Sequence, residues 1–402
     1  MISQLRVCHV WDSEYPWDVR VEKVSSALTA VGGEVHIVAR NRTGAPLHER
    51  LPEAEVHRIP PWGVLGRRLD AATSFPAFFN PRWIRAVTNT ARATDANIIL
   101  VRDLPLAPTA LMVGRRLGIP VVMDMAENYP AMMRSLWETG VHRRTDWFVR
   151  NPRLVESVER YVLPRLDHVL VVVEESGMRL QEQGLAGTRL TVVGNTPPRT
   201  RLATTPPRRH HDGGPLEVIY LGLLEAPRGI SNLIAAVARV REEGHAIRLT
   251  IIGSGREHEA FAEQARASLD EKSIRFLGRV PNADALALLE QADVGVVPHL
   301  ANASWNSTIP NKLFDYMATG LAVLTSSAVP AARVVRETGS GLVYQDTSIE
   351  DLAAALVQLR DVELRANCGR RGRDAVAERF NWEIDSARMV DTLHRVVAGR
   401  RE

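Results

Sequence analysis

Short apolar segments alternate with helix-length amphipathic segments along the chain, and this alternation occurs in two series. The first series of predicted strands begins at Leu5–Trp11 and ends at Leu190–Val193, and the second begins at Leu216–Tyr220 and ends at Gly341–Tyr344. Strands that alternate with helices assemble into parallel sheets with helices packed on their faces. The sequence therefore predicts an α/β protein with two doubly wound sheets.

A segment rich in Pro, Thr and Arg, NTPPRTRLATTPPRRHHDGGP, separates the two series and has no apolar periodicity. Such a composition is typical of a linker. With 402 residues, each half of the chain is long enough to bury a core of its own. We therefore predict a first domain over residues 1–195, a linker over 196–215, a second domain over 216–380 and a C-terminal helix over 381–402.

The composition argues against several classes of protein. The net charge is only +3, so no overall attraction to nucleic acid is expected. There are only two cysteines, and Cys8 falls in a predicted core strand, which suits a reducing cytosol. The N-terminus lacks a signal-peptide pattern, and no apolar run approaches the ~18 residues of a membrane span. We expect a cytoplasmic protein without a nucleic-acid partner.

The stretch Pro298–Gly320 follows a short apolar run, Val294–Val297, which predicts a buried parallel strand. A polar loop then leads to Pro310, which suits the first position of a helix, and Gly320 suits a left-handed cap at its end. A strand, a loop and a helix N-terminus in this order favour anion binding, because the first backbone N–H groups of a helix are unpaired.

Lys312 and Asp315 lie three residues apart near the start of this helix, so they share one face. The chain has only three lysines, and one of them is Lys312. A lysine beside the predicted phosphate site is therefore harder to attribute to chance. We predict that Lys312 binds phosphate and that Asp315 binds the sugar hydroxyls of a nucleotide-sugar. The alternative is an ordinary strand–loop–helix unit on which both side chains are simply exposed.

The segment PNKLFDYMATGLAVL resembles the donor-binding segment of family 4 glycosyltransferases, which have the GT-B fold. Those enzymes usually carry two glutamates with seven residues between them, and Ser307 and Asp315 occupy the two positions here. The resemblance implies two Rossmann-like domains that face a cleft, with the acceptor bound by the first domain and the nucleotide-sugar by the second. It also implies that the C-terminal helix crosses back to the first domain.

Three further segments of the second series resemble donor-binding turns of this family. YLGLLEAPRG places Gly222 at a strand end, where backbone can approach a ligand closely, and Arg228 where a guanidinium can bind phosphate. IIGSG and FLGRVPNADAL resemble the turns that lie against the nucleotide and its base. The donor-binding residues implied in this way are Gly222, Arg228, Gly253, Ser254, Gly278, Arg279, Val280, Asn306, Ser307, Thr308, Asn311, Lys312, Leu313 and Asp315.

The acceptor side is expected at strand ends and loops of the first series. Asp18 and Arg20 are candidates for substrate contact, and the alternative is a local salt bridge. Asp103 follows a strand at the edge where ligands bind in open α/β sheets. MDMAENYP resembles a family motif, Asp-X-His-Glu, but has Ala126 in the histidine position, so only Glu127 is assigned a role, either to an acceptor hydroxyl or as a helix cap. The residues predicted to be catalytic are Arg228, Lys312, Glu127 and Asp103.

No metal or other cofactor is expected. The chain has no Asp-X-Asp pair that would hold a metal–diphosphate complex, and its histidines and cysteines show no metal-ligand spacing along the sequence. Walker-type and Gly-X-Ser-X-Gly motifs are also absent from the sequence.

Arginines and aromatic residues are interleaved over Arg58–Arg92 and again over Arg134–Arg153. This pattern suits an anionic membrane surface or a lipid-linked acceptor. The alternative, which we favour, is that the aromatic side chains pack on the core and the arginines are solvated. The aromatic residues concerned are Trp62, Phe75, Phe78, Phe79, Trp83, Trp137, Trp147 and Phe148.

The resemblance extends over nearly the whole chain and implies transfer of a sugar from a nucleotide-sugar to an acceptor hydroxyl with retention of configuration. The acceptor is expected to be a sugar, a small molecule or a lipid-linked glycan, in the biosynthesis of a glycan or glycoconjugate. Two alternatives remain open at this point: a nucleotide-sugar epimerase on the same fold, and a non-catalytic partner subunit of a GT-B enzyme.

Overall fold

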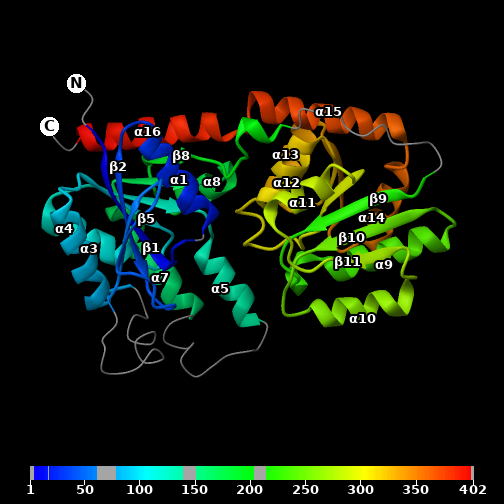
Figure 1. Cartoon of the computed structure of the whole chain (residues 1–402), viewed down its shortest axis with the longest axis horizontal. Coiled ribbons are helices and arrows are strands. Elements are labelled where there is room, and N and C mark those ends of the chain that lie inside the picture. The colour runs from blue at the N-terminus through cyan, green and yellow to red at the C-terminus, as the bar shows by residue number, and fades with distance from the viewer. Residues whose placement is uncertain (1–3, 17, 61–77, 139–150, 203–213, 400–402) are drawn as a thin grey trace. The chain divides into compact units, whose positions relative to one another are not determined.

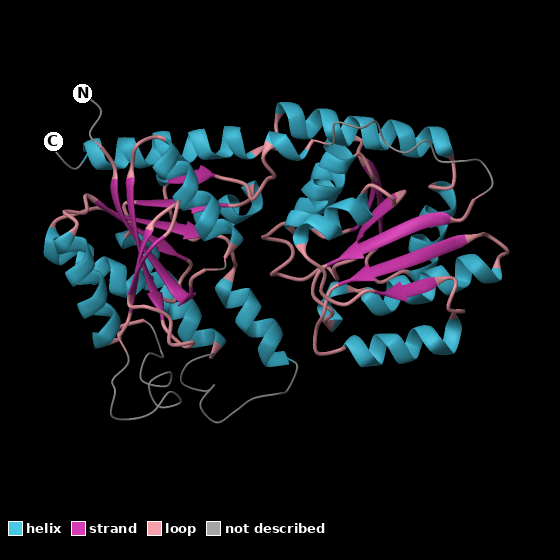
Figure 2. Ribbon diagram, in the orientation of Figure 1, coloured by secondary structure: helices cyan, strands magenta, loops and turns pink. Residues whose placement is uncertain are grey.

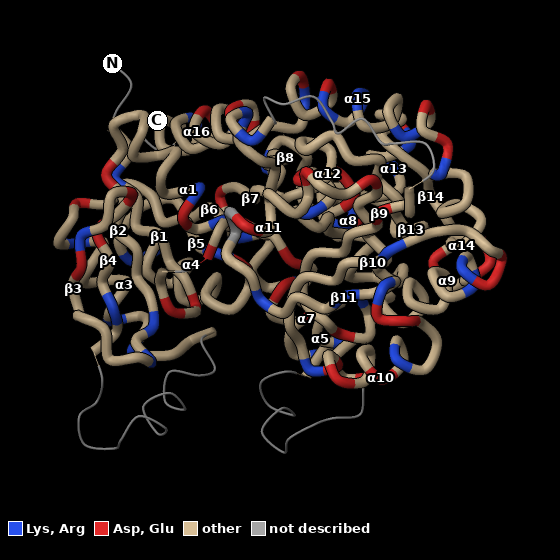
Figure 3. The backbone as a smooth tube through the Cα atoms, turned by 45° about the vertical axis from the view of Figure 1, so that its right-hand side comes forward, with Lys and Arg blue, Asp and Glu red and all other residues tan. Residues whose placement is uncertain are grey.

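The computed structural model describes residues 4–16, 18–60, 78–138, 151–202 and 214–399 (Figure 1). The chain divides into two compact units, Met1–Gly194 together with Asp385–Glu402, and Asn195–Ile384. Each unit consists of a sheet flanked by helices (Figure 2), which is the predicted α/β class. Basic and acidic residues are interspersed along the described backbone (Figure 3). Within the described ranges, no helix is both long and apolar enough to cross a membrane.

The first unit contains an eight-stranded sheet in the order β3-β4-β2-β1-β5-β6-β7-β8. Neighbouring strands are parallel, except that β3 pairs antiparallel with β4. The central strands β5 and β6 are buried along their whole length, as expected where both faces of a parallel sheet are covered. The strands are β1 (Arg6–Glu14), β2 (Glu34–Arg40), β3 (His48–Arg50), β4 (Glu55–Arg58), β5 (Ile98–Arg102), β6 (Val121–Met125), β7 (His168–Val171) and β8 (Leu190–Val192).

Helices connect these strands and bury one face against the sheet. Trp83 lies on α3 and is fully buried in the main core with Cys8, Val10 and Val38. This burial agrees with the packing alternative for that aromatic residue, whereas residues 61–77 and 139–150 lie outside the described residues. The helices are α1 (Val19–Ala30), α3 (Pro81–Ala93), α4 (Ala107–Leu117), α5 (Tyr129–Glu138), α7 (Pro152–Val162), α8 (Glu174–Glu182) and α16 (Trp382–Gly399), with the short 3-10 turns η1 (Leu163–Arg165) and η2 (Gly187–Arg189).

The second unit contains a six-stranded parallel sheet in the order β11-β10-β9-β12-β13-β14. Its strands are β9 (Leu216–Leu221), β10 (Ile247–Ile252), β11 (Ile274–Phe276), β12 (Val294–Val297), β13 (Ala322–Ser326) and β14 (Gly341–Tyr344). Its helices are η3 (Arg199–Arg201), η4 (Ala226–Arg228), α9 (Ile230–Glu242), α10 (His258–Ser268), α11 (Asn282–Leu289), α12 (Asn311–Thr319), α13 (Val329–Thr338), α14 (Ile349–Gln358) and α15 (Val362–Glu378).

Two local predictions differ from the structure. The short edge strand β3 was not predicted, because three residues are too few to show a periodicity. Pro310 was expected at the first helical position, but it adopts extended backbone (ψ 136°) and caps α12, which begins at Asn311. The predicted end of the helix is confirmed, since Gly320 has a left-handed conformation with φ 80°.

Helix α12 is seated on β12 through one close approach of a tyrosine to a glycine. A Cβ atom added to Gly295 would lie 2.3 Å from the ring of Tyr316, which is fully buried. The Tyr316 hydroxyl in turn accepts a hydrogen bond from the backbone N–H of Leu221 at 3.0 Å. The same tyrosine therefore sets the distance of α12 from β12 and links it to the end of β9.

Gly295→Ala is expected to destabilise the protein by about 1–3 kcal/mol, because the added methyl group overpacks a buried aromatic ring. The measurement is the midpoint of guanidinium unfolding. Gly214→Ala is the matched control, since an added Cβ there meets nothing within 4 Å. Equal stability of the two variants would show that Tyr316 can move at no cost and does not set the position of α12.

Candidate functional site

The side chain of Lys312 lies at the carboxyl ends of β9 and β12, in the first turn of α12. It is only 7% exposed, and its Nζ lies 4.0 Å from the centre of the Tyr220 ring. Among the described residues Nζ has no hydrogen-bond partner. Burial, together with the nearby Arg228 guanidinium, lowers the pKa of Lys312 well below its usual range. A buried amine in such a place is a candidate for binding an anionic ligand.

Two glycines bring backbone close to Lys312. Gly222 follows β9 with φ 145°, and an added Cβ there would lie 2.7 Å from Lys312 Nζ. Gly253 follows β10 with φ 140°, and an added Cβ there would lie 1.8 Å from the carbonyl oxygen of Gly222. The positive φ favours glycine at both positions, and at Gly253 an added side chain would also collide with backbone.

Arg228 ends the short helix η4 and is held by two aromatic side chains. Its guanidinium carbon lies 4.6 Å from the centre of the Trp305 ring, and Nη1 donates to His299 Nε2 at 3.2 Å. His299 and Trp305 are stacked, with ring centres 4.0 Å apart and 4° between the ring planes. Burial, Lys312 and Arg228 all lower the pKa of His299 well below its usual range, so its imidazole is neutral and accepts from Arg228. The stack therefore fixes the direction of the guanidinium.

The loop between β12 and α12 is held by its own side chains. Asn302 Oδ1 accepts from the backbone N–H groups of Ser304 and Trp305, at 2.9 and 3.0 Å. Ser307 is 4% exposed and its hydroxyl donates to the carbonyl of Ala303 at 2.6 Å. Ser307 therefore has a local structural contact at the position where a glutamate is usual in the family.

Asp315, the residue predicted to bind sugar hydroxyls, forms an ion pair with Arg201 of η3 at 3.3 Å. Both side chains are partly exposed, at 19% for Asp315 and 30% for Arg201. One turn earlier on the same helix, Asn311 Oδ1 accepts a hydrogen bond from Asn195 Nδ2 at 2.7 Å. The segment after residue 194 thus contacts the helix that carries Lys312.

The remaining predicted donor residues are distributed around these groups. Gly253 N–H donates to the carbonyl of Gly278, which has φ 63°, and the carbonyl of Ser254 accepts from Leu224. Arg279 is exposed, Val280 and Asn306 are half-buried, and Thr308 is buried. The Leu313 side chain is fully buried, and its N–H donates to the carbonyl of Pro310.

In the first unit, the predicted acceptor residues Asp18 and Arg20 have structural partners. Asp18 caps α1 and accepts from the N–H groups of Arg20 and Val21 at 3.0 and 2.8 Å. The Arg20 guanidinium is 2% exposed and forms hydrogen bonds to both oxygens of Asp124 and to the carbonyl of Val193. Burial alone would raise the pKa of Asp124, but Arg20 outweighs it and holds that pKa below its usual value. Arg20 therefore forms a salt bridge, as the alternative to substrate contact predicted, but its partner is the distant Asp124 and not a local residue.

Asp103 and Glu127 lie together at the ends of β5 and β6. Asp103 has φ 58°, pairs with Arg102 at 3.0 Å, and its Oδ1 accepts from the backbone N–H groups of Ala126 and Glu127. Burial raises the pKa of Asp103 despite the adjacent guanidinium. Asp103 therefore positions the backbone that carries Glu127. The cap expected of Glu127 is supplied by Asn128, whose Oδ1 accepts from Ala131 at 3.2 Å.

Several residues that contact the predicted donor-binding residues were not themselves predicted. Tyr220, His299 and Trp305 act through ring contacts with Lys312 and Arg228, and Arg201 acts through its ion pair with Asp315. Trp305 could have been singled out from the sequence, because a tryptophan is unusual in a loop of Asn and Ser.

Two family models match the chain, one over each unit. Residues 18–196 match the model described as "Glycosyl transferase 4-like domain", and residues 215–361 match "Glycosyl transferases group 1". Together with the two α/β units, these matches define a glycosyltransferase with the GT-B fold. The chain belongs to family 4 of these enzymes.

A curated relative and two solved structures agree with this assignment. The chain is 24% identical to glycogen synthase of Mycobacterium tuberculosis over 95% of its own length and 91% of that protein. Sucrose-phosphate synthase from Thermosynechococcus elongatus has the same fold, with a TM-score of 0.76, 17% identity and coverage of 98% and 100% of the two chains. Anabaena HepE in complex with UDP superposes with a TM-score of 0.70, 14% identity and coverage of 97% and 99%.

Lys312→Met is expected to stabilise the ligand-free protein at neutral pH by about 1–3 kcal/mol, because it removes a buried ammonium that lacks an acceptor. Between the lowered pKa of Lys312 and the usual lysine value of ~10.4, the unfolded chain binds more protons than the folded protein, so the free energy of unfolding of the wild type rises with pH in that range. The stability difference between Lys312→Met and the wild type should therefore become smaller as the pH rises. Urea unfolding at several pH values measures this, with exposed Lys272→Met as control. A Lys312→Met variant less stable than wild type at every pH would contradict the assignment.

Proposed function

We propose that this glycosyltransferase binds a nucleoside-diphosphate sugar at the carboxyl ends of β9 and β12 and transfers the sugar with retention of configuration and without a metal ion. The observation that carries the proposal is the buried Lys312 side chain, whose Nζ has no hydrogen-bond partner in the described part of the chain and lies beside Gly222. The UDP in the HepE structure supports a nucleoside diphosphate as the ligand class.

The main chemical requirement of this transfer is to stabilise the diphosphate as it leaves. Negative charge grows on its oxygens while the sugar becomes oxocarbenium-like. Lys312 and Arg228 supply two positive charges from a largely buried place, where electrostatic interactions are strong. Two fixed cations make a divalent ion unnecessary for this step, which is the basis of the metal-independence proposal.

Asp315 is proposed to bind the ribose hydroxyls, with Arg201 orienting its carboxylate. On the other unit, Glu127 is proposed to bind the acceptor hydroxyl, and Asp103 to hold the Glu127 backbone in place. The acceptor would be a sugar, a small molecule or a lipid-linked glycan. The two arginine- and aromatic-rich segments considered for contact with an anionic membrane fall largely on residues 61–77 and 139–150, outside the described residues.

The relatives do not favour an epimerase or a non-catalytic subunit. Incubation with donor alone and then with acceptor separates these functions, since epimerisation needs no acceptor and a non-catalytic subunit converts nothing.

Lys312→Met is expected to affect mainly the rate of transfer, and Asp315→Asn mainly the binding of the nucleotide. Lys312 faces charge that develops in the transition state, so Lys312→Met should lower kcat by about 10²–10³-fold. Asp315 contacts ribose, which changes little during the reaction, so Asp315→Asn should weaken UDP binding by about 1.5–3 kcal/mol. Steady-state kinetics and UDP titration by calorimetry measure the two effects. Wild-type UDP affinity and turnover in both variants would place the donor site elsewhere.

Turnover is expected to be unchanged by EDTA and by added Mg²⁺ or Mn²⁺. Initial rates at saturating donor, with and without a chelator, are the measurement. Loss of activity in EDTA that a divalent ion restores would contradict the metal-independent mechanism.

A further inference from the structure

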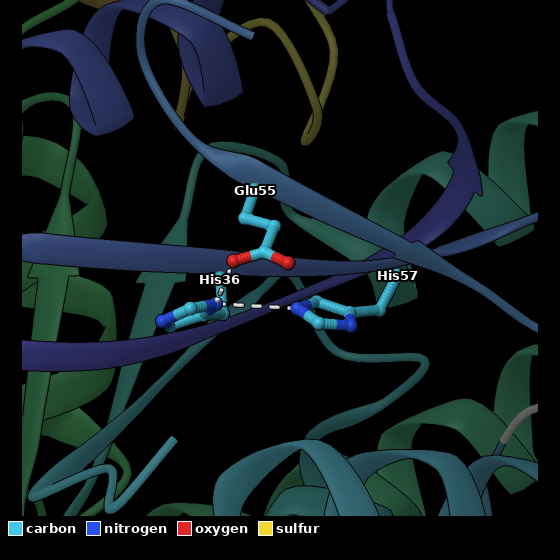
Figure 4. Close-up of side chains that lie close together, drawn as sticks. All are labelled: His36, Glu55 and His57. Carbon is cyan, nitrogen blue, oxygen red and sulfur yellow. Dashed lines mark hydrogen bonds and ion pairs between the residues drawn. The ribbon is translucent and has the colours of Figure 1, made fainter. Parts of the chain in front are cut away.

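Three side chains on neighbouring strands converge near the β3 edge of the first sheet. His36 lies on β2, and Glu55 and His57 lie on β4, which pairs with β2 in parallel. His36 is in register with Glu55, and His57 is two residues further along, so all three side chains stand on the same face. Figure 4 shows the two imidazole rings and the carboxylate pointing toward one another.

Two of the distances between these groups are close to those between neighbouring ligands of one metal ion. His36 Nδ1 lies 3.2 Å from His57 Nε2 and 3.6 Å from Glu55 Oε2. All three candidate ligand atoms lie within 4.8 Å of one another. Zinc bound at ~2.0–2.1 Å with tetrahedral geometry separates its ligand atoms by about 3.3–3.4 Å. The observed spacing leaves room for one ion of this size among the three atoms.

We propose that His36, Glu55 and His57 bind a zinc ion or a closely related divalent transition metal. Two imidazole nitrogens and one carboxylate oxygen form a donor set suited to zinc, whereas magnesium and calcium prefer oxygen alone. Three protein ligands leave a fourth position for water. The proposal is independent of the donor site, because all its residues belong to the first unit and none has a role in transfer.

The cluster extends to the neighbouring edge strand. A third imidazole, that of His48 on β3, places its Nδ1 3.2 Å from Nδ1 of His57, so His57 has an imidazole on each side.

His48 also has the position of a supporting residue. If His57 Nε2 bound the metal, the Nδ1–H group of His57 would donate a hydrogen bond to His48 Nδ1. Ligating histidines commonly donate their second ring N–H in this way, which fixes the tautomer and the ring orientation. The metal would join β2 to β4, and the supporting contact would add the short edge strand β3.

The local spacing of histidines did not indicate this cluster. His36 and His57 are 21 residues apart and meet only because β2 and β4 are neighbours in the sheet. The sequence-based expectation of no metal-ligand group therefore rested on spacing within single segments.

Cobalt(II) titration of tag-free, chelator-treated full-length protein tests the proposal. One equivalent should produce the visible absorption bands of low-coordinate cobalt with imidazole ligands, zinc should remove them, and zinc should raise the melting temperature. Glu55→Gln and His57→Gln should each abolish the bands, and His48→Gln should weaken cobalt binding about 10–100-fold. The Glu55 side chain is 47% exposed, so Glu55→Gln is expected to leave folding intact.

His245→Gln, in the second unit, is the matched control and should bind cobalt like the wild type. Absence of cobalt bands in the wild type would overturn the proposal. So would unchanged bands in both Glu55→Gln and His57→Gln, because the metal would then be bound elsewhere. Because the readouts are absorption and melting temperature, neither result depends on glycosyl transfer.

Discussion

The second unit depends on holding a positive charge where water does not reach it. Lys312 lies over the Tyr220 ring, and its place is set by the seating of α12 on β12 through Tyr316 and Gly295. Gly222 and Gly253 are needed because a side chain at either position would collide with Lys312 or with neighbouring backbone. The strand ends, the glycine turns and the aromatic contacts of Arg228 all lie around this side chain. A protein retains such an uncompensated charge at a cost in stability where a ligand uses it.

The first unit also buries charge at its strand ends, but there each charge has a partner. Arg20 pairs with Asp124, and Arg102 pairs with Asp103, all four side chains being less than 9% exposed. Paired groups of this kind position backbone, and Asp103 does so for Glu127. Among the described residues, these buried charges of the first unit are paired, whereas Lys312 Nζ in the second unit has no hydrogen-bond partner, and this contrast supports the proposal of an anion-binding site there.

The alternation of strands and helices predicted the fold class, because each parallel strand is a local apolar run that periodicity detects. Local motifs likewise identified Lys312, Gly222 and Arg228 as neighbours of strand ends. What could not be predicted depends on contacts between distant residues. Arg20 meets Asp124 across 104 positions, and Arg201 meets Asp315 across 114. The His36–Glu55–His57 cluster arises in the same way, from the order of the strands, whereas the His299–Trp305 stack depends on the path of a single loop.

The most direct test is NMR of the lysine side chains, which is practical because the chain has only three lysines. With ¹³C-labelled lysine, the Lys312 resonance can be assigned by its loss in Lys312→Met and followed against pH. The account predicts that it titrates well below the usual lysine value of ~10.4 in the free protein, and that UDP moves the titration upward. An ordinary titration that UDP leaves unchanged would contradict the claim that Lys312 is a buried cation completed by the diphosphate.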